Sequence, residues 1–168
     1  MCSKRIPYAQ AVHNTAMNTT IKTDIKQTEK LLSFVRKNAQ MGTTTLERLA
    51  EILGAADRGM TDIVSRQLNE YRHIADAAGT RARALGSEPE DVGGIARAAA
   101  TAILGLQSIA DKSASHIAEM IVIGSARGVI SALRQIRLNP NADSDAINLA
   151  YRLLCTERMN IDRLLCYV

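Results

Sequence analysis

Apolar residues recur every three or four positions along most of the chain, which is the spacing of amphipathic helices. One such stripe runs from about residue 23 and stops before Gly54, and a second follows Asp57 and stops before Gly86. Asp is a common helix N-cap, and Gly commonly follows a helix C-terminus. The pattern therefore predicts helices over about residues 23–53 and 58–85.

The stretch after the second helix predicts a longer helical segment. Ser87-Glu-Pro-Glu90 combines a capping box with Pro in the first turn, which marks a helix start. Residues 95–137 then keep the helical pattern without Pro, a length of about 60 Å in a single helix. This third helix is either continuous, which gives an up-down-up-down bundle, or split near Gly105 or Lys112, so that its first part crosses over the bundle. The short connection before it favours the continuous helix.

A last helix is predicted over about residues 145–166, after an Asn-Pro-Asn turn and an N-cap at Asp143 or Ser144. Its inner stripe carries Glu157 between leucines. An unpaired ionised carboxylate in a dry core costs several kcal/mol. Glu157 must therefore be protonated, paired, hydrogen-bonded, metal-bound or close to water. Together the patterns predict an all-α bundle of four principal helices.

The start of the chain differs from the rest, because residues 1–20 hold Pro7 and several Asn and Thr residues without a sustained period. We expect a flexible N-terminal arm, or a frayed helical lead-in, over residues 1–20 and one helical bundle domain over residues 21–168. The 168 residues are enough to bury a core. Aromatic residues are only 3% of the chain, so Leu, Ile, Ala and Met must fill that core.

The charge distribution indicates which kinds of partner to expect, and the cysteines indicate the cellular compartment. The net charge of +4 comes from basic residues scattered among acidic ones, which excludes the clustered basic stripe of a nucleic-acid-binding protein. No run of about 18 apolar residues is present, so we expect no membrane partner. Cys2, Cys155 and Cys166 are an odd number without CxxC spacing. They indicate reduced thiols in a cytoplasmic protein.

Several ionisable residues are candidates for a site. Glu70 and His73 form a Glu-x-x-His pair, whose spacing lets both side chains turn to one metal ion from one helix face. In an antiparallel hairpin that turns near residue 139, Glu157 is expected opposite residues 119–123. The resulting polar level holds four residues: His116, Glu119, Glu157 and Asn160. It is either structural, with His116 donating to Glu157 and fixing the helix register, or a metal site.

These residues resemble the ferritin-like four-helix superfamily, whose di-iron members place a Glu on the first and third helices and Glu-x-x-His on the second and fourth. The chain matches this pattern in part, through Glu70 and His73 on the second helix, Glu119 on the third and Glu157 on the fourth. It departs from it at Asn160, which stands at the position of the fourth-helix His, and near residues 38–40, where the first helix has no carboxylate. The resemblance implies a ferritin-like bundle that lacks two di-iron ligands.

A closer resemblance, over most of residues 27–168, is to an uncharacterised family of small helical proteins of Firmicutes. It rests on the segments KNAQMGTTTLERL, QLNEY, SHIAEMIVIGSARGV and ERMNIDRL. This resemblance implies a ferritin-like bundle and names no activity. It also implies that one set of residues forms a unit: His116, Glu119, Gly124, Ser125, Gly128 and Glu157.

Two functions from different classes follow. The first is a non-catalytic association or structural protein, whose partner is a second copy or another cytosolic protein. Gly124 and Gly128 would let a neighbouring helix backbone approach closely, and Ser125 can hydrogen-bond across such a contact. The alternative is that these glycines serve only helix packing inside the subunit. A nucleotide-binding loop, GxSxG and HExxH are all absent from the sequence, so catalysis has no support there.

The second function is a metal-binding ferritin relative with a degenerate site for a divalent iron, manganese or zinc ion. Two carboxylates at one height repel each other unless a cation or a proton lies between them, and this favours a bound metal. The candidate ligands are Glu70, His73, His116, Glu119 and Glu157.

Overall fold

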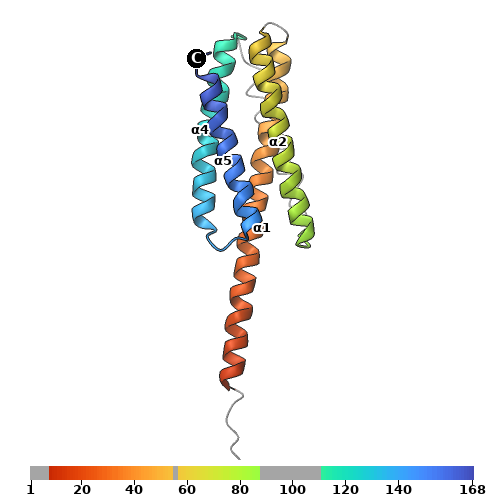
Figure 1. Ribbon diagram of the computed structural model, residues 1–168, viewed down its shortest axis with the longest axis vertical. Coiled ribbons are helices and arrows are strands. Elements are labelled where there is room, and N and C mark those ends of the chain that lie inside the picture. The colour runs from red at the N-terminus through yellow and green to blue at the C-terminus, as the bar shows by residue number, and fades with distance from the viewer. Residues whose placement is uncertain (1–7, 55–56, 88–110) are drawn as a thin grey trace, which may run out of the picture.

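The computed structural model describes residues 8–54, 57–87 and 111–168, with side chains from residue 22 onward. Its described part consists of four helices and contains no strand (Figure 1). The helices are α1 (Tyr8–Leu53), α2 (Arg58–Ala84), α4 (Ala114–Leu138) and α5 (Ser144–Leu164). The prediction of an all-α chain with four principal helices is confirmed at this level.

The helix ends follow the capping signals. The Met60 backbone N–H donates to the Asp57 carboxylate at 2.9 Å, and the Ala146 N–H donates to Asp143 at 2.7 Å. Asp143 is therefore the N-cap of α5. Gly54, with a φ of 58°, follows α1 and allows the chain to turn in a conformation that other residues rarely adopt.

The first helix begins earlier than predicted. It starts at Tyr8, directly after Pro7, and its N-terminal half projects beyond the other helices (Figure 1). The part of the expected arm that the structure describes, from Tyr8 onward, is thus helical. No Gly or Pro follows Pro7 before Gly42, so nothing in this stretch breaks the helix. Residues 1–7 lie outside the described residues.

The helix directions form two antiparallel hairpins. α1 pairs with α2, α4 pairs with α5, and α2 and α4 point the same way (Figure 1). The end of α2 and the start of α4 therefore lie at opposite ends of the bundle (Figure 1). The expectation of a continuous third helix with up-down-up-down connection was wrong.

The break lies near Lys112, which is one of the two positions considered. Residues 111–113 are not helical, and Ser113 caps α4 by accepting a hydrogen bond from the His116 N–H at 3.2 Å. A Ser cap competes with helix continuation, because its hydroxyl replaces a backbone carbonyl as acceptor. The first part of the predicted third helix, over residues 88–110, and most of its capping box lie outside the described residues.

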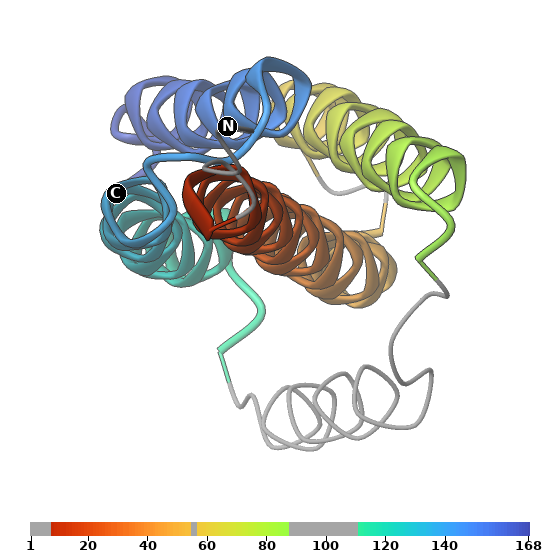
Figure 2. The same ribbon diagram turned by 90° about the horizontal axis from the view of Figure 1, so that it is seen from below.

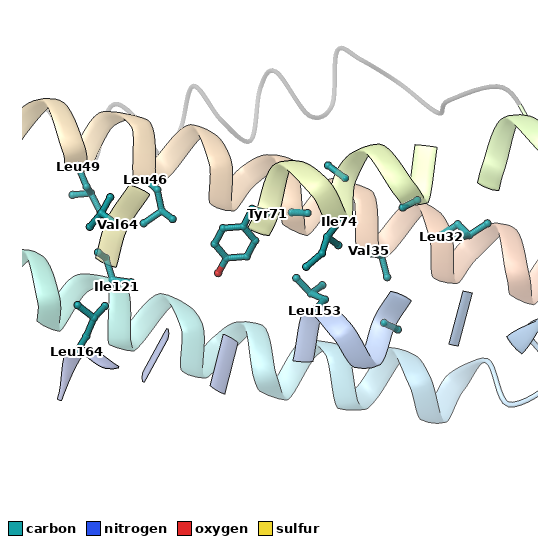
Figure 3. Close-up of a cluster of buried hydrophobic side chains, with 14 of the residues drawn as sticks. Leu32, Val35, Leu46, Leu49, Val64, Tyr71, Ile74, Ile121, Leu153 and Leu164 are labelled. Carbon is teal, nitrogen blue, oxygen red and sulfur yellow. The ribbon is translucent and has the colours of Figure 1, made fainter. Parts of the chain in front are cut away.

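The core is made of the predicted apolar stripes. α1 lies centrally and packs against all three other described helices (Figure 2). Figure 3 shows aliphatic side chains from all four described helices along the core, on both sides of Tyr71. Each fully buried Leu, Ile or Val contributes about 1.5–3 kcal/mol. The largest buried members are Leu31, Leu32, Val35, Leu49, Met60, Val64, Ile74, Ile117, Leu153 and Leu164.

Among the described helices, α4 alone is long and apolar enough to cross a membrane by length and composition. Only 28% of its most apolar window is buried in the bundle. The outer side of this helix is therefore unusually apolar.

Candidate functional site

The buried acid predicted on the last helix is present in the core. Glu157 of α5 is only 6% exposed. The Tyr71 hydroxyl donates to Oε2 of Glu157 at 2.7 Å, and the Asn160 side-chain amide donates to the Tyr71 hydroxyl at 3.1 Å. The Ser125 hydroxyl of α4 lies beside the Glu157 carboxyl group and favours its charged form. These four residues from three helices are the Glu157 cluster.

Burial sets the ionisation of this cluster. Desolvation raises the pKa of Glu157 to about 6, although the hydrogen bond from Tyr71 and the nearby Ser125 hydroxyl act in the opposite direction. Burial and the neighbouring carboxylate raise the pKa of Tyr71 well above its usual range. No cationic side chain among the described residues lies within ion-pair distance of Glu157. At neutral pH the cluster therefore holds a negative charge, and within the described part of the chain the groups that donate to it are neutral.

Two glycines leave space for the cluster. A Cβ at Gly128 of α4 would lie 2.6 Å from the Glu157 carboxyl carbon, and a Cβ at Gly42 of α1 would lie 3.0 Å from the Tyr71 ring. Real Cβ atoms do not approach that closely, so a larger residue at Gly128 must displace the carboxyl group. The glycine in the middle of α1 thus serves a close helix crossing over Tyr71.

A cavity of about 290 Å³ lies between α1 and α4 and reaches the Glu157 cluster. Tyr71 and Glu157 contribute to its lining, and Gly124, Ser125 and Gly128 belong to it as well. Exposed Arg127 also lines it. Most of the remaining wall is apolar and comes from Met41, Leu46, Leu49, Met120 and Ile121. An apolar cavity with a few convergent polar groups and a shifted pKa is typical of a small-molecule site.

The other predicted ligands lie on the surface. Glu70 accepts a hydrogen bond from Arg152 at 3.0 Å, and His73 is exposed. His116 pairs with Glu119 at 3.5 Å near the start of α4. In the described ranges no three His, Cys, Asp or Glu side chains gather closely enough to hold a metal ion. The structure therefore does not bring the five predicted ligands together.

The predicted polar level was wrong in its register. Glu157 lies against Ser125 and Gly128 rather than residues 119–123, so His116 does not donate to it. The cause is the connection between α4 and α5, which spans residues 139–143 and is centred later than the predicted turn. Facing positions on α4 accordingly lie later in the chain. Asn160 does belong to the level, through Tyr71.

Tyr71 was missed as a site residue, although its spacing of seven from Val64 and three from Ile74 puts it on the apolar side of its helix. A buried Tyr hydroxyl usually needs a hydrogen-bond partner. Glu157 was the one acid on an inner stripe, so the two could have been paired from the sequence patterns alone.

A second polar residue lies one turn from Tyr71. Gln67 is fully buried, and neither polar atom of its side-chain amide has a hydrogen-bond partner within the described part of the chain. An unpaired buried amide costs about 1–3 kcal/mol.

No protein-family model matches the chain, and comparisons with curated proteins and with solved structures found no match either. The function is therefore inferred from the Glu157 cluster and its cavity.

Proposed function

We propose that the protein binds a small organic amine in the cavity between α1 and α4. The ammonium group contacts the Glu157 carboxylate, and the apolar part of the ligand lies against the Met and Leu walls. The observation that carries this proposal is a buried carboxylate, without a cationic partner among the described residues, in the lining of a largely apolar cavity.

The electrostatics favour a cation over a neutral or anionic ligand. An ammonium group would supply the charge that Glu157 lacks, and a charge-assisted hydrogen bond in a low-dielectric site is stronger than a neutral one. Tyr71 holds the carboxylate in place by its hydrogen bond, and Ser125 lies beside it. The cavity volume of about 290 Å³ lies at the small end of ligand sites, which fits a compact amine.

The helix directions support a ferritin-like bundle as the framework of this site. Ferritin-like folds join two antiparallel hairpins by one long crossover, and in this chain the end of α2 and the start of α4 lie at opposite ends of the bundle. In such bundles the metal ligands project inward from facing helices. Only Glu157 of the proposed metal ligands does so here, and this favours an organic cation over a metal ion.

The test is calorimetric titration with n-hexylamine and the neutral n-hexanol near neutral pH. We expect the wild-type protein to bind the amine about 10- to 100-fold more tightly than the alcohol, because hydrogen bonds to charged groups contribute about 1.5–3 kcal/mol. Glu157→Gln should remove this preference while it keeps the shape of the cavity. Glu70→Gln is the matched control, since Glu70 is a surface acid paired with Arg152.

A second variant tests the place of binding. A Cβ at Gly124 would meet no atom within 4 Å, and Gly124 lines the cavity. Gly124→Leu should therefore fill the cavity and abolish binding of both ligands without unfolding the bundle. Equal affinity for amine and alcohol in the wild type, or the same loss in Glu70→Gln as in Glu157→Gln, would contradict the proposal.

A further inference from the structure

The outer side of α4 carries an apolar stripe that no described helix covers. Ile123 is 46% exposed, Ile130 59% and Leu133 37%, and Ala126 lies between them at the same spacing. We name Ile123, Ala126, Ile130 and Leu133 the outer α4 stripe. Their separations of three and four residues place them on one helix face.

This face points away from the bundle core. On an α-helix the stripe lies about half a turn from the buried residues Ile121, Ser125 and Ala132. Among the described helices α4 contacts α5 and α1, and it lies at a corner of the bundle (Figure 2). A contiguous exposed apolar face of this kind marks an interaction surface.

Opposite charges bound the stripe at its two ends. Exposed Glu119 continues the same spacing on the N-terminal side, and exposed Arg137 continues it on the C-terminal side. In an antiparallel arrangement about a two-fold axis, the ends of one α4 meet the opposite ends of the other. The charge pattern is therefore complementary to itself.

We propose that the outer α4 stripe binds the α4 helix of a second copy of this chain, in an antiparallel arrangement with two-fold symmetry. Glu119 lies opposite the partner's Arg137, Ile123 opposite the partner's Leu133, and Ala126 opposite the partner's Ile130. Symmetry repeats each contact, so two ion pairs flank a continuous apolar seam. Helix seams with this spacing and flanking charges are typical of coiled-coil pairing.

Two other charged residues of α4, Arg127 and Arg134, argue against a lipid bilayer as the partner of the stripe. A membrane-spanning α4 would place Arg127 close to the bilayer centre and Arg134 within the helix, and charged side chains are costly there. A paired helix keeps both arginines at the solvated sides of the seam. The stripe is also a narrow face, and the opposite face of α4 packs into the bundle core.

The association is separate from the cavity. Gly124 and Ser125 lie on other faces of α4, and Gly128 contacts Glu157 within the same subunit. Ser125 and Gly128, predicted as helix-packing or association residues, thus make contacts inside the subunit, as the packing alternative expects. The outer α4 stripe supplies the association surface instead, and Gly124→Leu should leave dimerisation unchanged.

The experiment is sedimentation equilibrium of the full chain over a range of concentrations. We expect the wild type to reach twice the 18.2 kDa of one chain. Ile130→Glu should weaken the dimer at least 100-fold, because it places two charges inside the seam. Leu165→Glu is the control, since Leu165 is 56% exposed but lies beyond the end of α5, and this variant should dimerise normally. Thermal unfolding followed by circular dichroism checks that both variants fold.

The register is tested by charge reversal. Glu119→Arg should weaken the dimer roughly tenfold, since it replaces two attractive pairs with two repulsive ones. Adding Arg137→Glu to the same chain should restore the wild-type affinity. A wild type that stays monomeric at high concentration, or a dimer that Ile130→Glu does not change, would overturn the proposal. Flotation of the wild type with anionic vesicles, lost in Ile130→Glu without any dimer in solution, would assign the stripe to a lipid surface and would also overturn it.

Discussion

Gly124 and Gly128 lie one turn apart on α4 and have opposite surroundings. A side chain at Gly128 would collide with Glu157, whereas a Cβ at Gly124 would point into open space beside the cavity. The first glycine thus leaves an opening and the second receives a buried carboxyl group. The comparison shows that two glycines one turn apart can line a cavity and serve internal packing at the same time.

The largest effect is expected at the filled position. Gly128→Ala should destabilise the fold by about 2 kcal/mol, because the overpacking of a tight contact, at about 3 kcal/mol, outweighs the gain of about 1 kcal/mol in helix propensity. Urea unfolding near neutral pH measures this change. A stability gain, as for an unconstrained helix glycine, would show that Glu157 does not need the space.

Glu157 itself sharpens the comparison through its pH dependence. Its native pKa of about 6 lies above the ordinary value of 4.5, so between these values the native state binds more protons than the unfolded state. Stability should therefore fall by about 2 kcal/mol as the pH rises through this window. Glu157→Gln should be more stable than the wild type near neutral pH by about the same amount and should lack this pH dependence. Equilibrium unfolding at several pH values measures both, and equal pH profiles for the two proteins would contradict the burial of the charge.

A substitution at Gln67, one turn from Tyr71, tests whether its buried amide has a hydrogen-bond partner. Gln67→Met keeps the side-chain volume and removes two unpaired polar atoms, so it should stabilise the fold by about 1–2 kcal/mol. The midpoint of chemical unfolding gives the difference. A clear loss of stability would mean that the amide has a hydrogen-bond partner, which would extend the polar cluster below the cavity.

The open position should respond in the opposite sense to Gly128. Gly124→Ala should stabilise the protein by about 1 kcal/mol, because the helix gains Ala propensity and the new methyl group meets no neighbour. The unfolding midpoints of Gly124→Ala and Gly128→Ala, each compared with that of the wild type, should therefore shift in opposite directions. Stability changes of the same sign at Gly124 and Gly128 would contradict the difference between their surroundings.

The smallest effect is expected at the surface pair on the same helix. Glu119→Gln should change the unfolding free energy of the subunit by less than about 0.5 kcal/mol, because both His116 and Glu119 are substantially exposed. Unfolding at low protein concentration isolates this term from association. A cost of several kcal/mol would return this pair to the candidate site.

Much of the fold was readable from the sequence, because local signals set it. The apolar spacing predicted the inner stripes of α1, α2 and α5, and single residues such as Asp57, Gly54 and Asp143 marked the helix ends. The break before α4 was one of two alternatives. The choice between a continuous and a split helix depended on the cap at Ser113 and on the directions of α2 and α4 in the bundle. Local sequence patterns do not determine these directions.

The candidate site was only partly readable, because its contacts are non-local. Glu157 was identified as a buried acid from its neighbours in the sequence. Its partner Tyr71 is 86 positions away, and its level against α4 depends on the centre of a five-residue connection. Because the centre of this connection was predicted slightly too early in the chain, His116 and Glu119 were expected at the level of Glu157, where the structure has Ser125 and Gly128.

The most direct test of the account is an NMR titration of the ¹³C-labelled Glu157 carboxyl group with and without n-hexylamine. The account predicts a pKa near 6 in the free protein, because burial disfavours the charge, and a lower pKa with saturating amine, because the ammonium stabilises the carboxylate. n-Hexanol should leave the pKa unchanged. A Glu157 pKa in the ordinary range, or one that the amine does not move, would contradict a cavity built around an uncompensated buried carboxylate.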